Sequence, residues 1–176
     1  MVVIRMQVNV SGKKTWHGVQ WCKCHFLIVL VLFFSPLAVA GSKPVIMVLG
    51  DSLVAGHGLP QGQTFPDILK NKLATDGIDV AMINAGVSGD TTAGGLARLD
   101  WSLADNPDAA IIVLGGNDLL RGLDPKTSYE SLNAIINRLK DRNVKILLAG
   151  MQAPRNPGAD YAAEFDRIYP ALAAKH

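Results

Sequence analysis

The feature that most constrains this chain is an uninterrupted apolar segment, residues 45–49, which runs directly into the sequence Gly-Asp-Ser-Leu at residues 50–53. An apolar run without polar alternation is typical of a parallel strand that is covered on both faces. Gly50 allows a sharp turn at the end of such a strand, and the residues after it can begin a helix. Ligands of open α/β sheets bind outside the carboxyl ends of strands. Ser52 therefore lies where a reacting side chain is expected, although a serine there can equally be a helix N-cap.

Further apolar runs recur along the chain, and segments with helical spacing of apolar residues separate them. The additional strands are expected at residues 80–83, 109–114 and 145–149. The helices are expected at residues 65–75, from 91 or 92 to about 104, at 126–141 and at 161–174. Strands that alternate with helices predict an α/β fold, in which helices cover both faces of a parallel sheet.

Residues 1–40 have the order of a secretory signal peptide. They hold four basic residues and no acidic residue, then an apolar run at 26–37, and end in Ala-Val-Ala at 38–40. The apolar run is too short to span a bilayer core of about 30 Å. We expect cleavage after Ala40, which leaves one domain at residues 41–176 in the periplasm or outside the cell. A retained N-terminal membrane anchor is the alternative.

The composition changes once this leader is set apart. The leader holds four of the 17 basic residues and none of the 15 acidic ones, so the formal charge of the remainder is −2 and not +2. No basic patch for nucleic acid remains. Both cysteines, Cys22 and Cys24, also lie in the leader, so neither a disulfide nor a thiolate metal site is expected. No Gly-x-Gly-x-x-Gly spacing predicts a nucleotide cofactor. We expect a monomer without metal or cofactor.

Three turns follow three of the predicted strands and should converge on one edge of the sheet. They are Gly-Asp-Ser at 50–52, Asn-Ala-Gly at 84–86 and Gly-Gly-Asn-Asp at 115–118. Acyl transfer needs a nucleophile and donors aimed at the oxygen that becomes negative. The backbone N–H groups of Ser52 and Gly86 and the side-chain amide of Asn117 can supply those donors.

These blocks resemble the SGNH, or GDSL, hydrolases. The matching sequences are Gly-Asp-Ser-Leu at 50–53, Asn-Ala-Gly-Val-Ser-Gly-Asp-Thr-Thr at 84–92 and Leu-Gly-Gly-Asn-Asp at 114–118, while residues 88–99 are typical of the secreted acyl-CoA thioesterase, lysophospholipase and arylesterase group. The resemblance implies a flavodoxin-like three-layer sandwich with a parallel sheet. It also implies that Ser52 attacks an ester or thioester and that Ser52, Gly86 and Asn117 bind the oxyanion. Position 54 is Val, so the Gly-x-Ser-x-Gly elbow of α/β-hydrolases is absent.

One departure from the family concerns the base. The family's fourth block, Asp-x-x-His near the C-terminus, supplies the base and the carboxylate that orients it, and this chain ends before such a block. Four strands would also leave the apolar run 145–149 at a sheet edge. We therefore expect a domain that lacks its last strand, its C-terminal helix and its catalytic Asp and His, with weak activity or none.

The remaining polar candidates are given lesser roles. His57 is expected to face substrate or solvent, and His176 to be a solvated terminus, with general base as the less favoured alternative for each. Asp51, Asp90 and Asp118 are expected to shape turns.

Leu119, Leu120 and Leu123 are expected to line an acyl-binding groove, with a place in the core as the alternative. The predicted partner is a small acyl ester or thioester, and membrane contact is limited to the leader or a lipid substrate. Two other functions stay open, namely a non-catalytic acyl- or lipid-binding protein and a carbohydrate deacetylase of the same family.

Overall fold

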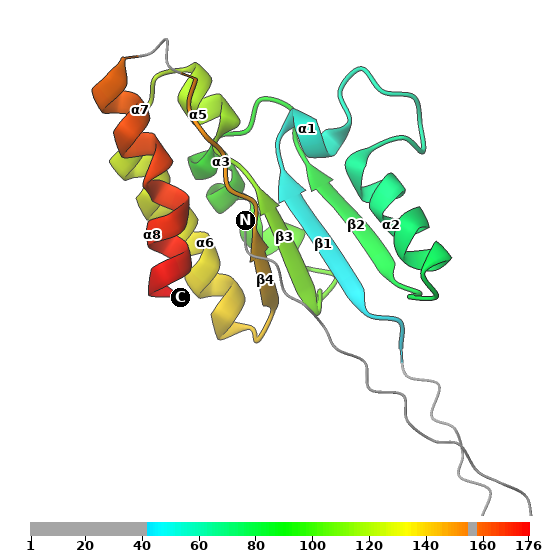
Figure 1. Ribbon diagram of the computed structural model, residues 1–176. Helices are drawn as coiled ribbons and strands as arrows, with labels where there is room; N and C mark the ends of the chain where they lie inside the picture. The colour runs from blue at the N-terminus through cyan, green and yellow to red at the C-terminus, as the bar shows by residue number, and fades with distance from the viewer. Residues whose placement is uncertain (1–41, 155–157) are drawn as a thin grey trace, which may run out of the picture. The chain divides into compact units, whose positions relative to one another are not determined.

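The computed structural model describes residues 42–154 and 158–176, and the leader predicted at residues 1–40 lies outside these. Within them, four strands form one parallel sheet (Figure 1). The strands are β1 (Val45–Gly50), β2 (Ala81–Gly86), β3 (Ala109–Val113) and β4 (Lys145–Leu148), in the order β2-β1-β3-β4. The predicted parallel α/β fold is therefore confirmed.

Strand β2 differs from its prediction at its carboxyl end. Residues 84–86 were expected to be a turn, but they continue the strand, and Gly86 pairs in register with Gly50 of β1. The expectation was wrong because parallel pairing with β1 supplies partners for the backbone groups of this polar and small-residue segment. The two strands consequently end at the same level, immediately before the two loops of interest.

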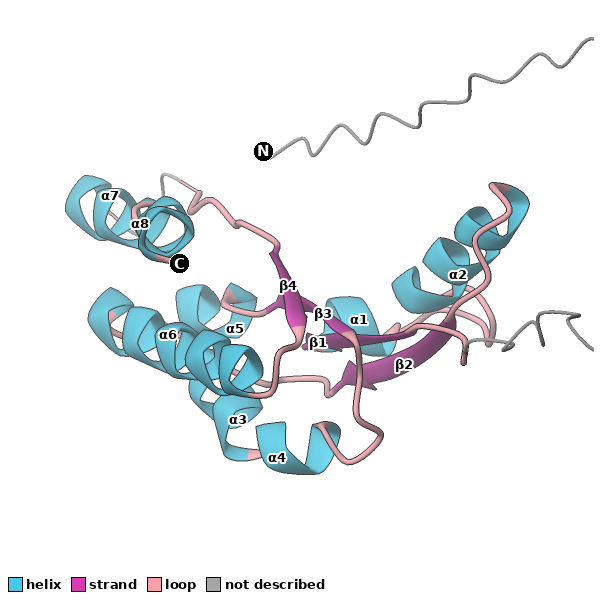
Figure 2. Ribbon diagram, turned by 90° about the horizontal axis from the view of Figure 1, so that it is seen from below, coloured by secondary structure: helices cyan, strands magenta, loops and turns pink. Residues whose placement is uncertain are grey.

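The helices cover both faces of this sheet (Figure 2). They are α1 (Ser52–Ala55), α2 (Phe65–Thr75), α3 (Thr92–Ala97), α4 (Leu99–Ser102), α5 (Gly116–Leu120), α6 (Pro125–Asp141), α7 (Ala159–Asp166) and α8 (Ile168–Lys175). Two predicted helices are each divided in two. The segment expected at 161–174 breaks at Arg167, because Pro170 has no N–H to donate to residue 166. The segment expected to run to about residue 104 breaks at Arg98, whose φ of −102° and ψ of 6° depart from helical values.

Alternate residues of β1 build two cores, one on each face of the sheet. Met47 and Leu49 belong to the larger core, to which the buried residues of α6, α7 and α8 contribute. Val48 belongs to a smaller core with Val54 of α1, against which Leu69 of α2 packs. This alternation follows from the two-residue period of a strand. No helix in the described part of the chain has the length and apolar character needed to cross a membrane.

Strand β4 forms one edge of the sheet, as expected. Its residues were predicted to be covered on both faces, but only Ile146 and Leu148 pack against the larger core. Leu147 points to the other face and is 51% exposed. An exposed edge strand with an apolar side chain favours pairing with a second chain.

We predict that Leu147→Lys reduces self-association, because a charge on an edge strand opposes edge-to-edge pairing. The free energy of unfolding should change by no more than about 0.5 kcal/mol, as for other surface substitutions. Self-association is measured by sedimentation velocity and by light scattering as the protein concentration is raised. The free energy of unfolding is measured by urea unfolding. Leu120→Lys, which puts the same charge on α5, is the control and should leave association unchanged. Equal association of the parent and the Leu147→Lys variant would contradict the prediction.

Candidate active site

The turn between β1 and α1 presents Ser52 at the carboxyl edge of the sheet. Asp51, not Ser52, caps helix α1, because its Oδ1 accepts a hydrogen bond of 3.0 Å from the Leu53 N–H. The alternative of Ser52 as the cap is therefore wrong. Ser52 is half-buried, and within residues 42–154 and 158–176 neither its N–H nor its hydroxyl has a hydrogen-bond partner. Both groups are available to a ligand.

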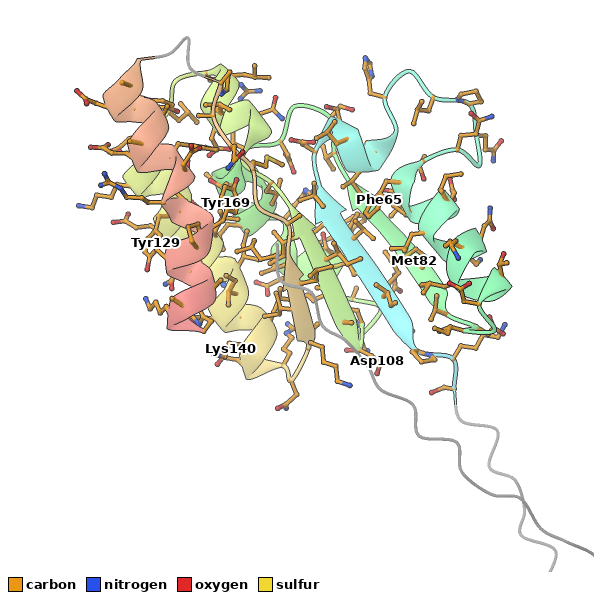
Figure 3. All side chains as sticks on the ribbon, viewed as in Figure 1. Phe65, Met82, Asp108, Tyr129, Lys140 and Tyr169 are labelled. Atoms are coloured by element: carbon orange, nitrogen blue, oxygen red, sulfur yellow. The ribbon has the colours of Figure 1, made fainter. Side chains whose placement is uncertain are left out.

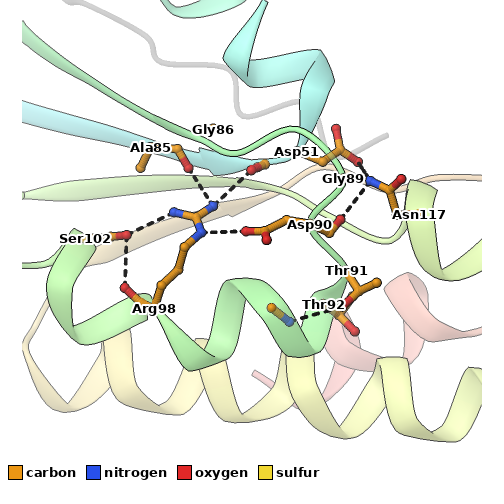
Figure 4. A network of polar contacts seen from close by, with 12 residues as sticks. Asp51, Ala85, Gly86, Gly89, Asp90, Thr91, Thr92, Arg98, Ser102 and Asn117 are labelled. Carbon is orange, nitrogen blue, oxygen red and sulfur yellow. Dashed lines mark hydrogen bonds and ion pairs between the residues drawn. The ribbon is translucent and has the colours of Figure 1, made fainter. Parts of the chain in front are cut away.

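Asn117 in α5 contacts the segments that follow β1 and β2. Its Nδ2 donates to Asp51 Oδ2 at 3.3 Å and to the Asp90 carbonyl at 2.8 Å (Figure 4). Asp51 adjoins Ser52, and Asp90 belongs to the loop between β2 and α3. The expected convergence of these segments is thus present in the structure, and the bond to Asp51 is the longer of the two.

Gly86 fits a packing role better than the donor role inferred from the sequence. Its N–H already donates to Asn84 Oδ1 at 3.0 Å, and Asn84 Nδ2 in turn donates to the Val54 carbonyl at 3.0 Å. A Cβ on Gly86 would overlap the backbone of Val54 and Ala55 in helix α1. Glycine at this position therefore lets β2 approach α1 closely, and the geometry does not support Gly86 as an oxyanion donor.

Gly89 is a candidate backbone donor that was not predicted from the sequence. It has a φ of +86°, which favours glycine, and its carbonyl accepts a hydrogen bond of 2.8 Å from Arg121 Nη2. Among the described residues no acceptor engages its N–H. Gly89 directly precedes Asp90, whose carbonyl holds Asn117. The signal was present in the second block, where a glycine stands before the aspartate at residue 90.

Asp118 ties helices together, which goes beyond the turn-shaping role expected for it. The buried carboxylate accepts hydrogen bonds from the Thr92 N–H at 2.8 Å, the Thr92 hydroxyl at 2.6 Å and the Ser128 hydroxyl at 3.0 Å. These donors come from α3 and α6, so Asp118 connects both helices to α5. A buried carboxylate with three donors is well satisfied.

The three leucines predicted to line an acyl groove do not form one set. Leu119 packs against the larger core. Leu120 is 83% exposed and Leu123 is 37% exposed. Leu119 is partly buried, so Leu120 and Leu123 are the more exposed of the three.

Neither histidine ring in the described part of the chain makes a hydrogen bond to Ser52. His57 is exposed, and its backbone N–H, not its ring, donates to the Ser52 carbonyl at 3.1 Å. The His176 ring lies against α6, with Nε2 at 2.9 Å from Asn133 Oδ1 and Nδ1 at 3.4 Å from Lys140 Nζ. Partial burial and the charges of Lys140 and Lys175 lower the pKa of His176. Among the described residues, no three His, Cys, Asp or Glu side chains cluster so as to hold a metal ion.

Tyr169, which is labelled in Figure 3, lies on α8 and bonds the residue before the turn that leads to Asn117. Its hydroxyl donates to the Leu114 carbonyl at 2.9 Å, and the ring of Phe165 packs edge-on against it at 5.9 Å. Gly115 has a φ of +122°, and a Cβ there would overlap the Tyr169 hydroxyl. Burial, with the charges of Asp118 and Asp51, raises the pKa of Tyr169 far above its ordinary value.

These features define a class: an α/β protein with an accessible serine at the carboxyl edge of a parallel sheet. Comparison with known proteins gives the family. Residues 48–176 match the GDSL-like Lipase/Acylhydrolase family, and the chain belongs to it. The family predicted from the sequence is therefore confirmed.

Relatives agree with this assignment. An arylesterase of Vibrio mimicus is 41% identical over 148 residues, which cover 84% of this chain and 74% of the relative. Thioesterase 1/protease 1/lysophospholipase L1 of Escherichia coli strain K12 is 36% identical over 167 residues, which cover 94% of this chain and 74% of the relative. The crystal structure of AlinE4, an SGNH-hydrolase family esterase, matches with 51% identity and a TM-score of 0.74, over 77% of this chain and 73% of that one. The predicted SGNH hydrolase fold is likewise confirmed.

Gly86→Ala should lower the free energy of unfolding by about 1–3 kcal/mol or more, because the new methyl group overlaps the backbone of α1. The variant keeps the Gly86 N–H, so it isolates the packing role. Urea unfolding followed by circular dichroism measures the change. Gly150→Ala is the matched control, since its Cβ would make only ordinary contacts, the nearest at 3.6 Å from Tyr169. A Gly86→Ala variant as stable as the parent would refute the packing role.

Tyr169→Phe should lower the free energy of unfolding by about 1–3 kcal/mol, because the Leu114 carbonyl loses its donor. Tyr169 stays protonated in the folded protein above pH 10, while the same tyrosine ionises in the unfolded chain. Its contribution is therefore complete below pH 10 and decreases as the pH rises further, by up to about 1.4 kcal/mol per pH unit.

The alkaline decrease in stability should accordingly be shallower in Tyr169→Phe than in the parent, as measured by urea unfolding between pH 9 and 11. Tyr129→Phe removes a hydroxyl without a hydrogen-bond partner among the described residues, and it should change stability at pH 8 by less than about 0.5 kcal/mol. Identical pH slopes for the parent and Tyr169→Phe would contradict the assignment.

Proposed function

We propose that this protein hydrolyses small acyl esters or thioesters by attack of the Ser52 hydroxyl on the substrate carbonyl. The observation that carries the proposal is the double contact of Asn117 Nδ2 with Asp51 and with the Asp90 carbonyl. These two bonds hold together the segments that follow β1, β2 and β3, beside Ser52, whose hydroxyl has no hydrogen-bond partner among the described residues. Relatives named arylesterase and thioesterase support esters and thioesters as the substrates.

In the proposed reaction a bond forms between Ser52 Oγ and the carbonyl carbon, and the carbonyl electron pair moves to the oxygen. Collapse of this intermediate expels the alcohol or thiol and leaves an acyl ester on Ser52, which water then cleaves. The negative oxygen accepts hydrogen bonds from the Ser52 N–H, the Gly89 N–H and Asn117 Nδ2. Each such donor contributes about 10²- to 10³-fold to kcat.

Asn117 serves this role by exchanging one of its two bonds. The bond to Asp51 is 3.3 Å long and gives way to the substrate oxygen, while the 2.8 Å bond to the Asp90 carbonyl keeps the amide oriented. Shorter hydrogen bonds of this kind are the stronger ones.

The Ser52 proton requires a base, and the described residues place no free base at its hydroxyl. Within the described residues, no hydrogen bond joins the Ser52 hydroxyl to the ring of His57 or His176 or to an Asp51 oxygen. In a serine protease, loss of one triad member leaves about 10³- to 10⁴-fold catalysis over water. We therefore expect slow turnover that an added base accelerates.

Hydrolysis of p-nitrophenyl acetate, with and without imidazole, tests this proposal. Imidazole should raise the Ser52-dependent rate by about tenfold or more, because a positioned general base contributes about 10²- to 10⁴-fold and a diffusing one supplies part of that. Ser52→Ala is the control, because it measures the direct reaction of imidazole with the ester, which is then subtracted from the parent rate. The proposal fails if Ser52→Ala and the parent hydrolyse the ester equally at every imidazole concentration. Fast Ser52-dependent turnover without imidazole would show that a further group of the protein acts as base.

Two further parts of the proposal concern substrate and location. The exposed side chains of Leu120 and Leu123 can contact the acyl chain, since they lie on and just after the helix that carries Asn117. Export to the periplasm or the medium is supported by the basic, apolar and small-residue order of residues 1–40.

A further inference from the structure

Arg98, at the break between α3 and α4, makes an unusual set of contacts below the candidate site (Figure 4). Its side chain is 17% exposed. Nε donates to Asp90 Oδ2 at 2.5 Å, Nη2 to the carbonyls of Gly50 and Ala85 at 3.0 and 2.9 Å, and Nη1 to the Ser102 hydroxyl at 3.1 Å. A single side chain therefore satisfies acceptors in four separate segments.

Three of those acceptors belong to the segments that carry the candidate catalytic groups. Gly50 is the last residue of β1 and is followed by Asp51 and Ser52. Ala85 lies at the end of β2, and Asp90 follows Gly89 in the next loop. Arg98 thus connects the backbone that places the nucleophile to the backbone that places the Gly89 N–H.

The link extends to Asn117 through Asp90. The Asp90 carboxylate binds Arg98, and the Asp90 carbonyl accepts from Asn117 Nδ2. Movement of Asp90 away from Arg98 would shift both the adjoining Gly89 N–H and the acceptor that orients Asn117.

We propose that Arg98 is a positioning residue for the reaction at Ser52, which holds the nucleophile turn, the Gly89 loop and, through Asp90, the Asn117 amide in one arrangement. This inference rests on the function proposed above. Arg98 itself touches none of the reacting atoms, so its effect acts through the geometry of the oxyanion donors. A displacement of about 1 Å in such a site is enough to lower a rate by about 10²-fold.

The chemistry of the side chain explains why arginine is needed. The planar guanidinium presents five N–H donors in a rigid fork, and here it donates to a carboxylate, two carbonyls and a hydroxyl together. Lysine offers three donors from one nitrogen and cannot reach all four acceptors at once. Arg98→Lys therefore preserves the charge while it removes the geometric connection.

The test compares Arg98→Lys with Arg138→Lys in the full chain. Arg138 lies on α6, is about half exposed and contacts Asp100 at 3.4 Å, so it is a matched control with no link to the site. In p-nitrophenyl acetate hydrolysis with imidazole, Arg98→Lys should lower the Ser52-dependent kcat by about 10²-fold and change KM by less than about threefold. Arg138→Lys should leave both unchanged.

A second readout does not depend on turnover. In ¹⁵N-correlated NMR spectra, the side-chain amide signals of Asn117 and the backbone signal of Gly89 should shift in Arg98→Lys and stay in place in Arg138→Lys. Asp90→Asn is the second variant if Arg98→Lys does not fold, because it keeps the backbone carbonyl for Asn117 but removes the charge that Arg98 binds. It should shift the same signals and lower kcat in the same direction.

The inference is overturned if folded Arg98→Lys keeps kcat within about threefold of the parent, or if the loss falls on KM alone. It is also overturned if Asp90→Asn or Arg98→Lys leaves the Asn117 and Gly89 signals unmoved. Absence of Ser52-dependent turnover in the parent contradicts the proposed function instead, and the NMR comparison then decides the role of Arg98 separately.

Discussion

The ends of the parallel strands impose the main constraint on this structure, because the last backbone groups of each strand must find partners outside the sheet. Gly50 and Ala85, at the ends of β1 and β2, direct their carbonyls to Arg98, and the Gly50 carbonyl also accepts from the Val87 N–H. Leu114, after β3, directs its carbonyl to Tyr169. Arg98 and Tyr169 therefore donate hydrogen bonds to the strand ends from which the loops around Ser52 and Asn117 begin.

The polar groups beneath the site are consequently well satisfied. Asp51 and Asp118 are both buried, and each accepts hydrogen bonds from two or more groups. In the described part of the chain, no fully buried side-chain nitrogen or oxygen lacks a partner. Such networks restrict movement, since leaving any member unpaired costs about 1–3 kcal/mol. A rigid set of donors suits a reaction in which charge develops at one defined oxygen.

The sequence predicted the strands, the parallel sheet and the convergence on Ser52 and Asn117, because apolar runs and the glycine-containing segments that follow them are local signals. It did not predict which glycine keeps a free N–H. The Gly86 N–H donates to the Asn84 side chain, and the conformation of that side chain cannot be read from the sequence. Gly89 is therefore the better candidate for an oxyanion donor. The contacts of Arg98 could not be predicted from the sequence either, because its acceptors lie up to 48 residues away and come close only in the folded protein.

The hydrogen bond from Tyr169 to Leu114 also bears on the order of events during folding. It spans 55 residues of sequence, and its donor lies in the last described helix. Long-range contacts of this kind form late, after the entropy of closing the intervening loop has been overcome. The Leu114 carbonyl therefore gains this donor only after residue 169 has been synthesised. The turn that leads to Asn117 thus depends on a helix at the far end of the described chain.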